Sequence, residues 1–202
     1  MNMSVIAGHL ILMMAPSGSG KGTLTRHVQG TFPELVHTVS CTTREARPHE
    51  VDGVQYYFLS KEVFEHKIAQ GDFIEWAEYS GNLYGTLHTE LTNRLVRGDI
   101  VLCEIEIQGV LQLIQRIPKE HRTIIYIDAG DWIALKARAL KRAPMSEEEI
   151  KLRYCRYQEE VAHKDIADYI VYNHEGCLEK AKQDMEEIVE KIITQVTHAK
   201  NK

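Results

Sequence analysis

The sequence predicts an α/β protein in which a parallel β-sheet is flanked by helices. Short apolar runs, which are typical of buried parallel strands, alternate with helical patterns along most of the chain. The apolar runs are residues 9–15, 100–105, 123–127 and 168–172. The helical patterns are residues 21–29, 108–116, 132–141, 146–163 and 179–196. Strands that alternate with helices in this way form a parallel sheet covered on both faces.

The fourth helical pattern begins with Ser146 and has Glu149 three residues later, which is the spacing of a capping box. The regular alternation is interrupted between residues 36 and 92. Short strand-like pieces at residues 37–41, 54–58 and 73–79 surround polar turns, and residues 61–70 have a helical pattern. We therefore expect a small mixed insert attached to the parallel sheet.

Length and charge restrict the possible functions. A chain of 202 residues fits one compact domain. A net charge of -5 and a pI of about 6.1 argue against attraction of the whole molecule to nucleic acid or to anionic membranes. The apolar run near the N-terminus, residues 10–15, is too short to cross a bilayer and follows no basic segment. We expect neither a nucleic-acid partner nor a membrane partner.

The cysteines are widely spaced and contain no C-x-x-C pair, which argues against a disulfide framework or a zinc site. They are Cys41, Cys103, Cys155 and Cys177. Reduced thiols in the cytosol are the expected state, and we predict a cytoplasmic location.

A glycine-rich loop follows the first strand-like run and leads into the first helical pattern. Successive backbone N–H groups of such a loop surround a phosphate group, and the helix N-terminus adds partial positive charge. Lys21 supplies a mobile cation for the β- and γ-phosphates of a nucleotide. This context predicts a P-loop NTPase core. The loop residues are Ala15, Pro16, Ser17, Gly18, Ser19, Gly20, Lys21, Gly22 and Thr23.

Two departures from the usual P-loop pattern concern its ends. Ala15 replaces the first glycine, and Gly22 replaces the Ser or Thr whose hydroxyl binds Mg²⁺. Mg²⁺ dehydrates reluctantly, so we expect it to keep waters where that hydroxyl is missing. Thr23 follows directly, and its hydroxyl can contact a phosphate oxygen or bond within its own helix.

Two acidic residues, Glu104 and Glu106, stand at the end of the apolar run 100–105, at the edge where parallel sheets bind ligands. A carboxylate at the end of a buried strand is costly unless it faces a metal, a cation or a polar ligand. Residues two apart in a strand share a face, so both can point at one site. Glu104 suits the role of holding a water on Mg²⁺, and Glu106 suits accepting hydrogen bonds from a base; a solvated strand end is the alternative.

Several stretches resemble the signature of the guanylate kinases. They are Ser40-Cys-Thr-Thr-Arg44-Glu-Ala-Arg47, Glu50-Val-Asp-Gly53 with Tyr56, Phe73-Ile-Glu75-Trp-Ala-Glu-Tyr-Ser-Gly-Asn-Leu-Tyr84-Gly-Thr86, and Glu104-Ile-Glu106-Ile-Gln-Gly109. The resemblance continues through residues 135–142, 146–150, 153 and 170–173. It covers residues 9 to 195, nearly the whole chain, in one order and spacing.

The resemblance implies transfer of a phosphoryl group from ATP to GMP, and to dGMP, with Mg²⁺ accompanying ATP. It assigns GMP phosphate binding to Ser40, Arg44, Arg47, Tyr56 and Tyr84, and guanine recognition to Glu75, Thr86 and Glu106. The glycine-rich loop and Asn173 would bind ATP, with Asn173 near the adenine. The residues implied in catalysis are Lys21, Arg44, Arg138, Arg142 and Arg153.

The resemblance also implies a single domain with three parts: a core (1–35, 93–138 and 158–202), a GMP-binding insert (36–92) and a lid (139–157). The family usually has Asp at the positions of Glu104 and Glu106, Pro at Ala46 and Gly at His49, and its lid is richer in arginine and glycine. Two other interpretations remain open. The chain could phosphorylate another acceptor, or it could be a peptide-binding module that has lost the phosphate machinery; Lys21 argues against the latter. The oligomeric state is not predicted.

Overall fold

The computed structural model describes residues 6–79, 81–142 and 144–200, and it contains the expected parallel sheet. Five strands pair in parallel in the order β2-β7-β1-β8-β9. They are β2 Leu35–His37, β7 Ile100–Glu104, β1 His9–Met14, β8 Arg122–Asp128 and β9 Tyr169–Tyr172. The central strand β1 is almost fully buried, because it is paired on both edges and covered on both faces.

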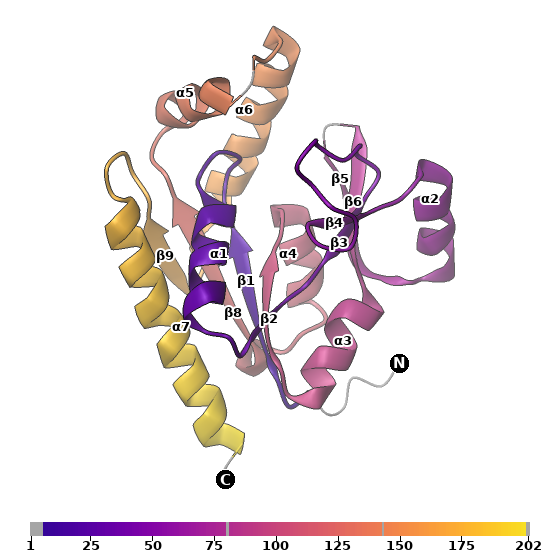
Figure 1. Cartoon of the computed structure of the whole chain (residues 1–202), viewed down its shortest axis with the longest axis vertical. Coiled ribbons are helices and arrows are strands. Elements are labelled where there is room, and N and C mark those ends of the chain that lie inside the picture. Colours follow the sequence, from indigo (N-terminus) through magenta and orange to yellow (C-terminus); the bar gives the residue numbers. More distant parts are fainter. Residues whose placement is uncertain (1–5, 80, 143, 201–202) are drawn as a thin grey trace.

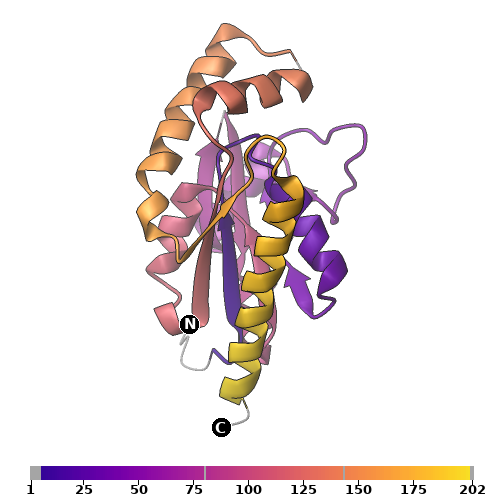
Figure 2. The ribbon, with the colours of Figure 1, turned by 90° about the vertical axis from the view of Figure 1, so that its left-hand side faces the viewer.

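Helices cover both faces of this sheet (Figures 1 and 2). On one face, α1 (Lys21–Thr31) and α7 (Leu178–Lys200) pack on Ile11 and Met13 of β1. On the other face, α3 (His88–Arg97) and α4 (Ile107–Ile114) pack on Leu10 and Leu12. Successive side chains of a strand point to opposite faces, so one apolar run supplies both halves of the core.

The insert forms a second sheet with the strand order β4-β3-β6-β5, in which β3 and β4 are parallel and the other pairs are antiparallel. Its strands are β3 Ser40–Thr42, β4 Tyr56–Phe58, β5 Phe73–Tyr79 and β6 Asn82–Leu87, and its helix is α2 Lys61–Gln70. The helix has the expected bounds and packs on the sheet through its own small core. That core consists of Cys41, Phe64, Phe73 and Leu83, and the rings of Phe64 and Phe73 stack at 4.3 Å.

The strand expected at residues 37–41 is two strands in two different sheets. β2 ends at His37 and belongs to the parallel sheet, whereas β3 begins at Ser40 in the insert. The chain passes from one sheet to the other at residues 38–39.

Strand β6 and helix α3 were not expected from the sequence. The strand pattern of β6 is interrupted by Gly85, where a Cβ atom would lie 2.9 Å from the Glu75 carbonyl oxygen. The expected insert borders at residues 36 and 92 fall within β2 and α3.

Helices α5 (Trp132–Arg142) and α6 (Glu147–Ala162) rise above the carboxyl edge of the parallel sheet (Figures 1 and 2). They extend beyond the expected lid, residues 139–157, on both sides. The capping box is confirmed: Ser146 Oγ accepts from the Glu149 amide, and the Glu149 carboxylate accepts from the Ser146 amide. Trp132 contacts Tyr154, with ring centroids 5.3 Å apart, and joins the two helices.

The base of α5 and α6 is tied to the sheet by Asp128, the last residue of β8. One of its carboxylate oxygens accepts from Lys164, in the 3₁₀ turn Lys164–Ile166 that follows α6. The other accepts from the Gly130 amide and lies 3.2 Å from His174 Nε2, in the loop that follows β9. A second 3₁₀ turn, Lys119–His121, precedes β8.

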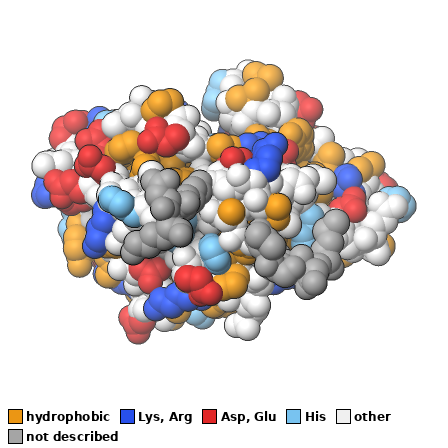
Figure 3. Space-filling view, turned by 90° about the horizontal axis from the view of Figure 1, so that it is seen from below, with side chains coloured by type: hydrophobic (Ala, Val, Ile, Leu, Met, Phe, Trp, Pro, Cys, Tyr) orange, Lys and Arg blue, Asp and Glu red, His pale blue; other side chains and the backbone are white. Residues whose placement is uncertain are grey.

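The helices, the surface charges and the cysteines can be compared with the expectations from the sequence. None of the helices within residues 6–79, 81–142 and 144–200 combines the length and the apolar character needed to cross a membrane. On the face seen from below, acidic and basic side chains are interspersed (Figure 3). All four cysteines are free thiols, and burial raises the pKa of Cys41 and of Cys103 to about 12.

The small insert core predicts a sharp difference between two adjacent residues of α2. Phe64 is fully buried, whereas Val63 is 46% exposed. Phe64→Ala should lower the free energy of unfolding by about 3–5 kcal/mol, since it removes an aromatic ring and leaves a cavity. Val63→Ala should lower it by less than about 1 kcal/mol. Urea denaturation followed by circular dichroism measures both; equal losses would contradict the separate core.

Candidate active site

The glycine-rich loop lies between the end of β1 and the start of α1, as expected. Gly18 and Gly20 have φ angles of 92° and 91°, in the left-handed region that favours glycine. A Cβ atom at Gly20 would also lie 2.5 Å from Asn173 Nδ2, which donates to the Ser19 carbonyl oxygen at 2.7 Å. Arg138 in turn donates to the Asn173 carbonyl oxygen at 3.0 Å. The Asn173 side chain therefore holds the loop at Ser19, and Arg138 in turn holds the backbone of Asn173.

The loop presents a hydroxyl and an ammonium group to the site. Ser19 Oγ is buried, and within the described part of the chain it has no hydrogen-bond partner. Lys21 is half-buried and its Nζ lies 3.4 Å from the Ala15 carbonyl oxygen. Helix α1 has no acidic residue in its first turn, so its N-terminus keeps its partial positive charge. These groups suit the binding of phosphate oxygens.

Acidic residues from two directions surround Lys21. Burial alone would lower the pKa of Lys21, but Glu106, Glu160 and Glu104 act in the opposite direction and raise it above its ordinary value. The lysine therefore stays charged at neutral pH. Tyr56 of the insert also contributes to this shift, which places the phosphate loop beside the insert.

Glu104 ends β7 and faces the start of α1. Its carboxylate oxygens lie 3.8 and 3.9 Å from the point where a Cβ atom of Gly22 would stand. A hard carboxylate oxygen therefore lies beside the position from which the usual hydroxyl is missing. Among the described residues, no group of three or more His, Cys, Asp and Glu side chains is arranged to hold a metal ion. This donor set fits Mg²⁺ held through waters and nucleotide oxygens better than a metal held by protein alone.

The insert contributes a buried carboxyl group, that of Glu75 on β5, which is 5% exposed. Burial raises the pKa of Glu75 to about 7, although hydrogen bonds with the side chain and backbone of Thr86 lower it. Thr86 Oγ1 lies 3.3 Å from Ser40 Oγ. A Cβ atom at Gly109 of α4 would lie 2.5 Å from Glu75 Oε2, so only glycine leaves room for this carboxyl group.

Arg44 and Arg47 lie in the loop after β3 and share one carboxylate, that of Glu50. Arg44 Nη2 donates to both oxygens of Glu50 at 2.9 Å, and the Arg47 amide donates to one of them at 2.8 Å. The Arg44 guanidinium also lies over the ring of Tyr56, 5.5 Å from its centroid. The rings of Tyr56 and Tyr84 form a T-shaped pair, with centroids 6.0 Å apart. The side chain of Arg44 and the backbone of Arg47 are therefore fixed before any anion binds.

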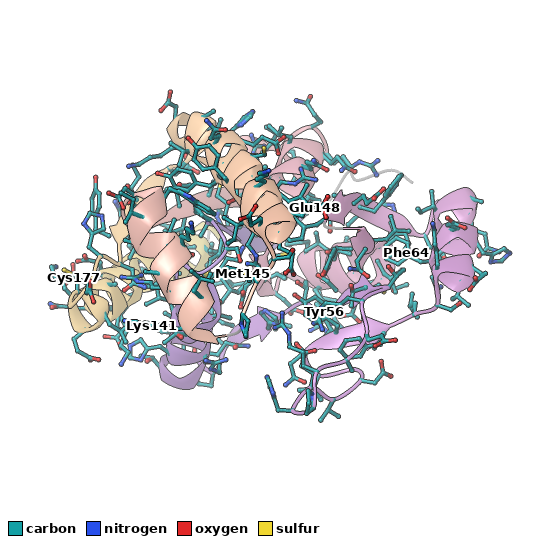
Figure 4. All side chains as sticks on the ribbon, turned by 90° about the horizontal axis from the view of Figure 1, so that it is seen from above. Tyr56, Phe64, Lys141, Met145, Glu148 and Cys177 are labelled. Carbon is teal, nitrogen blue, oxygen red and sulfur yellow. The ribbon has the colours of Figure 1, made fainter. Side chains whose placement is uncertain are left out.

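The expected lid reaches this site through Arg153, in the middle of α6. Arg153 Nη1 donates to Ser17 Oγ at 2.6 Å, which joins the lid to the phosphate loop. Arg142 ends α5, but its side chain lies outside the described residues. Seen from above, the lid helices lie beside the insert, on which Tyr56 and Phe64 are labelled, and Met145 marks the turn between α5 and α6 (Figure 4).

The structure thus brings most of the expected site residues to one place, where the sheet's carboxyl edge, the insert and the lid meet. The sequence patterns did not indicate four further residues: Gly109, Glu50, Arg156 and Glu160. Gly109 and Glu50 stand within the quoted signature stretches, although no role was assigned to them. Arg156 and Glu160 follow Arg153 at helical spacing, and this spacing is the feature of the sequence that could have indicated them.

Proteins of one family are similar to this chain over most of its length. The family model described as guanylate kinase matches residues 7–192. A guanylate kinase of Rubrobacter xylanophilus is 41% identical over 186 residues, covering 92% of this chain and 95% of the relative. A guanylate kinase of Carboxydothermus hydrogenoformans is 37% identical over 182 residues, covering 90% and 87%.

A solved structure supports the same grouping. The crystal structure of guanylate kinase from Anaplasma phagocytophilum has a TM-score of 0.72 and 26% identity, and the match covers 94% of this chain and 88% of that one. The fold and the glycine-rich loop define a P-loop protein with an insert and a lid. The chain belongs to the guanylate kinase family.

The raised pKa of Glu75 predicts a pH-dependent stability. Between pH 4.5 and about 7 the folded chain keeps a proton on Glu75 that the unfolded chain releases. The stabilisation from this carboxyl group is therefore fully present below pH 4.5 and is lost as the pH rises through about 7. From pH 4.5 to 8, the parent should lose on the order of 3 kcal/mol more than Glu75→Gln.

Urea denaturation at a series of pH values measures this difference. Glu78→Gln, an exposed acid on the same strand, serves as the control and should follow the parent. Parallel pH curves for the parent and Glu75→Gln would show that Glu75 ionises normally in the folded chain.

Proposed function

We propose that the chain is a guanylate kinase that transfers the γ-phosphoryl group of ATP to GMP, and to dGMP, giving ADP and the nucleoside diphosphate. The observation that supports this most directly is the position of Lys21. It is surrounded electrostatically by Glu104 and Glu106 at the sheet edge and by Tyr56 of the insert. A donor phosphate on the loop and an acceptor phosphate on the insert would therefore meet beside the same ammonium group.

Guanine recognition is assigned to Glu75, Glu106 and Thr86. Guanine offers N1–H and an exocyclic amine, and both are donors that suit carboxylate acceptors. Adenine has an unprotonated N1, so a carboxylate facing it would oppose a lone pair. Gly109 supports this assignment, because it leaves room for the Glu75 carboxyl group. Binding of guanine would favour the ionised form of Glu75. Because the pKa of Glu75 is about 7, its deprotonation at neutral pH costs little free energy.

The acceptor phosphate is assigned to Arg44 and Arg47, with Ser40, Tyr56 and Tyr84 as hydroxyl donors. Arg44 Nη2 donates to Glu50 and Nη1 to the Glu45 carbonyl oxygen, and a guanidinium has five N–H groups, so some N–H groups are left for an anion. A dianionic phosphate suits such forked guanidinium donors. The exposed side chain of Arg47 can move toward the phosphate more freely than that of Arg44.

The reaction requires no general base, because the attacking oxygen of GMP is already anionic. Catalysis then consists of aligning the two phosphates and neutralising their charge, with Lys21, Arg138, Arg142 and Arg153 on the donor side. Mg²⁺ bound with ATP supplies further charge neutralisation, and Glu104 would hold its waters. Asn173 is assigned to the adenine side of ATP, where it already braces the loop through Ser19. Closure of α5 and α6 would exclude water that could accept the phosphoryl group.

The proposed compartment is the cytosol, in keeping with free buried thiols at Cys41 and Cys103. The proposed division into core, GMP-binding insert and lid follows the two sheets and the helices above them. The competing interpretation is a peptide-binding module. Such a module needs neither a functional Lys21 nor selectivity among acceptors, so kinetic measurements distinguish it from a kinase.

A coupled ADP-release assay with ATP, Mg²⁺ and a panel of GMP, dGMP, AMP, UMP and CMP tests the function. We expect GMP to give the highest kcat/KM and dGMP to be accepted. Lys21→Ala should lower kcat by about 100- to 1,000-fold while the melting temperature changes little, since it removes a charge that acts in the transition state. Near-normal turnover in folded Lys21→Ala protein, or no acceptor in the panel, would refute the kinase.

The division of labour between insert and loop predicts a selective defect. Arg44→Met should raise the KM for GMP by about 10- to 100-fold and leave the KM for ATP within about threefold, because Arg44 serves the acceptor phosphate. Arg97→Met provides a matched control, since Arg97 is an exposed arginine on α3 that pairs with Asp99. A larger defect in the KM for ATP than in that for GMP would show that the insert is wrongly assigned.

A further inference from the structure

Helix α6 contacts both substrate-binding parts of the site through two arginines. Arg153 and Arg156 stand at positions i and i+3, which are neighbours on one face of an α-helix. Arg153 Nη1 donates to Ser17 Oγ of the phosphate loop at 2.6 Å. Arg156 Nη2 donates to the Glu78 carbonyl oxygen, in β5 of the insert, at 3.0 Å. One continuous helix therefore joins the phosphate loop to the insert.

Arg156 is held by two further contacts. Its guanidinium lies over the ring of Tyr79, the last residue of β5, 5.6 Å from the centroid. A guanidinium at this distance is attracted by the negative face of the ring. Arg156 Nη1 donates to the Glu159 carboxylate at 2.9 Å, within α6. The side chain of Arg156 is therefore fixed between its own helix and the end of β5.

The ring of Tyr79 leads directly into the acceptor side of the site. Tyr79 and Tyr84 form a T-shaped pair, with centroids 6.2 Å apart. Tyr84 forms the next T-shaped pair with Tyr56, and the Arg44 guanidinium lies over the Tyr56 ring. The proposed function assigns Tyr84, Tyr56 and Arg44 to the acceptor phosphate. A continuous series of contacts thus runs from Arg156 to these three residues.

The backbone of the insert gives the same connection. Strand β5 carries Glu75, which is assigned to guanine, as well as Glu78 and Tyr79. It pairs with β6, where Tyr84 stands opposite Ala77. The contact with Arg156 therefore holds α6 against the pair of strands that carries residues for both the base and the phosphate of the acceptor.

A simpler interpretation is an ordinary surface arginine. The pair with Glu159 fits that interpretation, since exposed pairs within one helix contribute little. The hydrogen bond to Glu78 does not, because it joins residues that are 78 positions apart and belong to different parts of the fold. The acceptor is also a main-chain oxygen, which belongs to β5 whatever side chain stands there. Arg156 is therefore a tie between the expected lid and the insert.

We propose that Arg156 is a positioning residue that couples the binding of the two nucleotides, by holding α6 against the end of β5. The inference rests on the proposed function, which places ATP on the phosphate loop and GMP on the insert. Either nucleotide then restricts the same helix, so the second nucleotide binds with a smaller loss of conformational entropy. Such coupling is reciprocal: GMP tightens the binding of ATP by the same factor by which ATP tightens that of GMP.

Isothermal titration calorimetry measures this coupling without turnover. The probe is AMP-PNP, a non-hydrolysable ATP analogue, titrated with Mg²⁺ into the protein alone and into the protein saturated with GMP. In the parent, GMP should lower the Kd of AMP-PNP by at least about fivefold. Arg156→Met keeps an unbranched side chain but removes the charge and the donors. In this variant GMP should change the Kd of AMP-PNP by less than about twofold.

The Kd of each nucleotide measured alone should stay within about threefold of the parent in Arg156→Met, because Arg156 is assigned to neither nucleotide. Two controls on the same helix should keep the coupling of the parent. Lys151→Met removes an exposed cation, and Glu159→Gln removes the partner of Arg156 within α6 but leaves the Glu78 carbonyl and the Tyr79 ring in place. Thermal melting verifies the folding of each variant. If Arg156→Met does not fold, Arg156→Ala carries the same prediction.

Three results would overturn the inference. GMP could leave the Kd of AMP-PNP unchanged in the parent, or folded Arg156→Met could keep the full coupling. Lys151→Met could also lose as much coupling as Arg156→Met. A purely structural role for Arg156 gives the second of these results, since it lowers the melting temperature and weakens both nucleotides while GMP still tightens AMP-PNP as in the parent.

Failure of the proposed function gives a different result, because turnover tests that function and calorimetry tests the coupling. If the parent phosphorylates another nucleoside monophosphate of the panel instead of GMP, the guanine specificity is wrong. Titrations with that monophosphate then decide the role of Arg156 by the same comparison. A parent that phosphorylates none of the acceptors would overturn both.

Discussion

The organisation of the site depends on one constraint, the burial of like charges at the carboxyl edge of the parallel sheet. The carboxyl groups of Glu104, Glu106 and Glu160 converge on this edge. Without a compensating charge, their mutual repulsion would destabilise this arrangement. Lys21 supplies the opposite charge, and the raised pKa of Glu160 favours its neutral form. Two structural parts contribute to this balance: the core gives Lys21, Glu104 and Glu106, and helix α6 gives Glu160.

The insert solves a separate problem, which is to hold cations in readiness for an anion. Glu50 lies between Arg44 and Arg47 and is almost completely buried. It compensates the positive charge of the two arginines in the empty site and keeps Arg44 in a single orientation. A phosphate that arrives there adds to an existing ion pair instead of ordering two free side chains. The separate apolar core of the insert keeps this loop in place independently of the parallel sheet.

Much of the fold could be predicted, because its signals are local. The apolar runs predicted four of the five strands of the parallel sheet, glycine with lysine predicted the phosphate loop, and Ser146 with Glu149 predicted the start of α6. Other features depend on contacts between distant residues. The break at residues 38–39 reflects a change of pairing partner from β7 to β4 and β6. The strand pattern of β6 is hard to see in the sequence because Gly85 interrupts it. Glu160 looks like any helix acid until α6 is placed against Glu106.

The ties made by Asp128 have a mechanical consequence. The strand that leads into α5, the turn that leaves α6 and the loop after β9 all meet at this carboxylate. Both ends of the lid are therefore fastened at one point, and a rigid rotation about this pivot would carry the two helices together. Helix α6, with its 16 residues, spans about 24 Å. A rotation of about 10° at the pivot moves its far end by roughly 4 Å, while Glu160, near the pivot, moves by only a fraction of that. A rotation about Asp128 would therefore shift Arg153, in the middle of α6, more than Glu160, and the turn between α5 and α6 most of all.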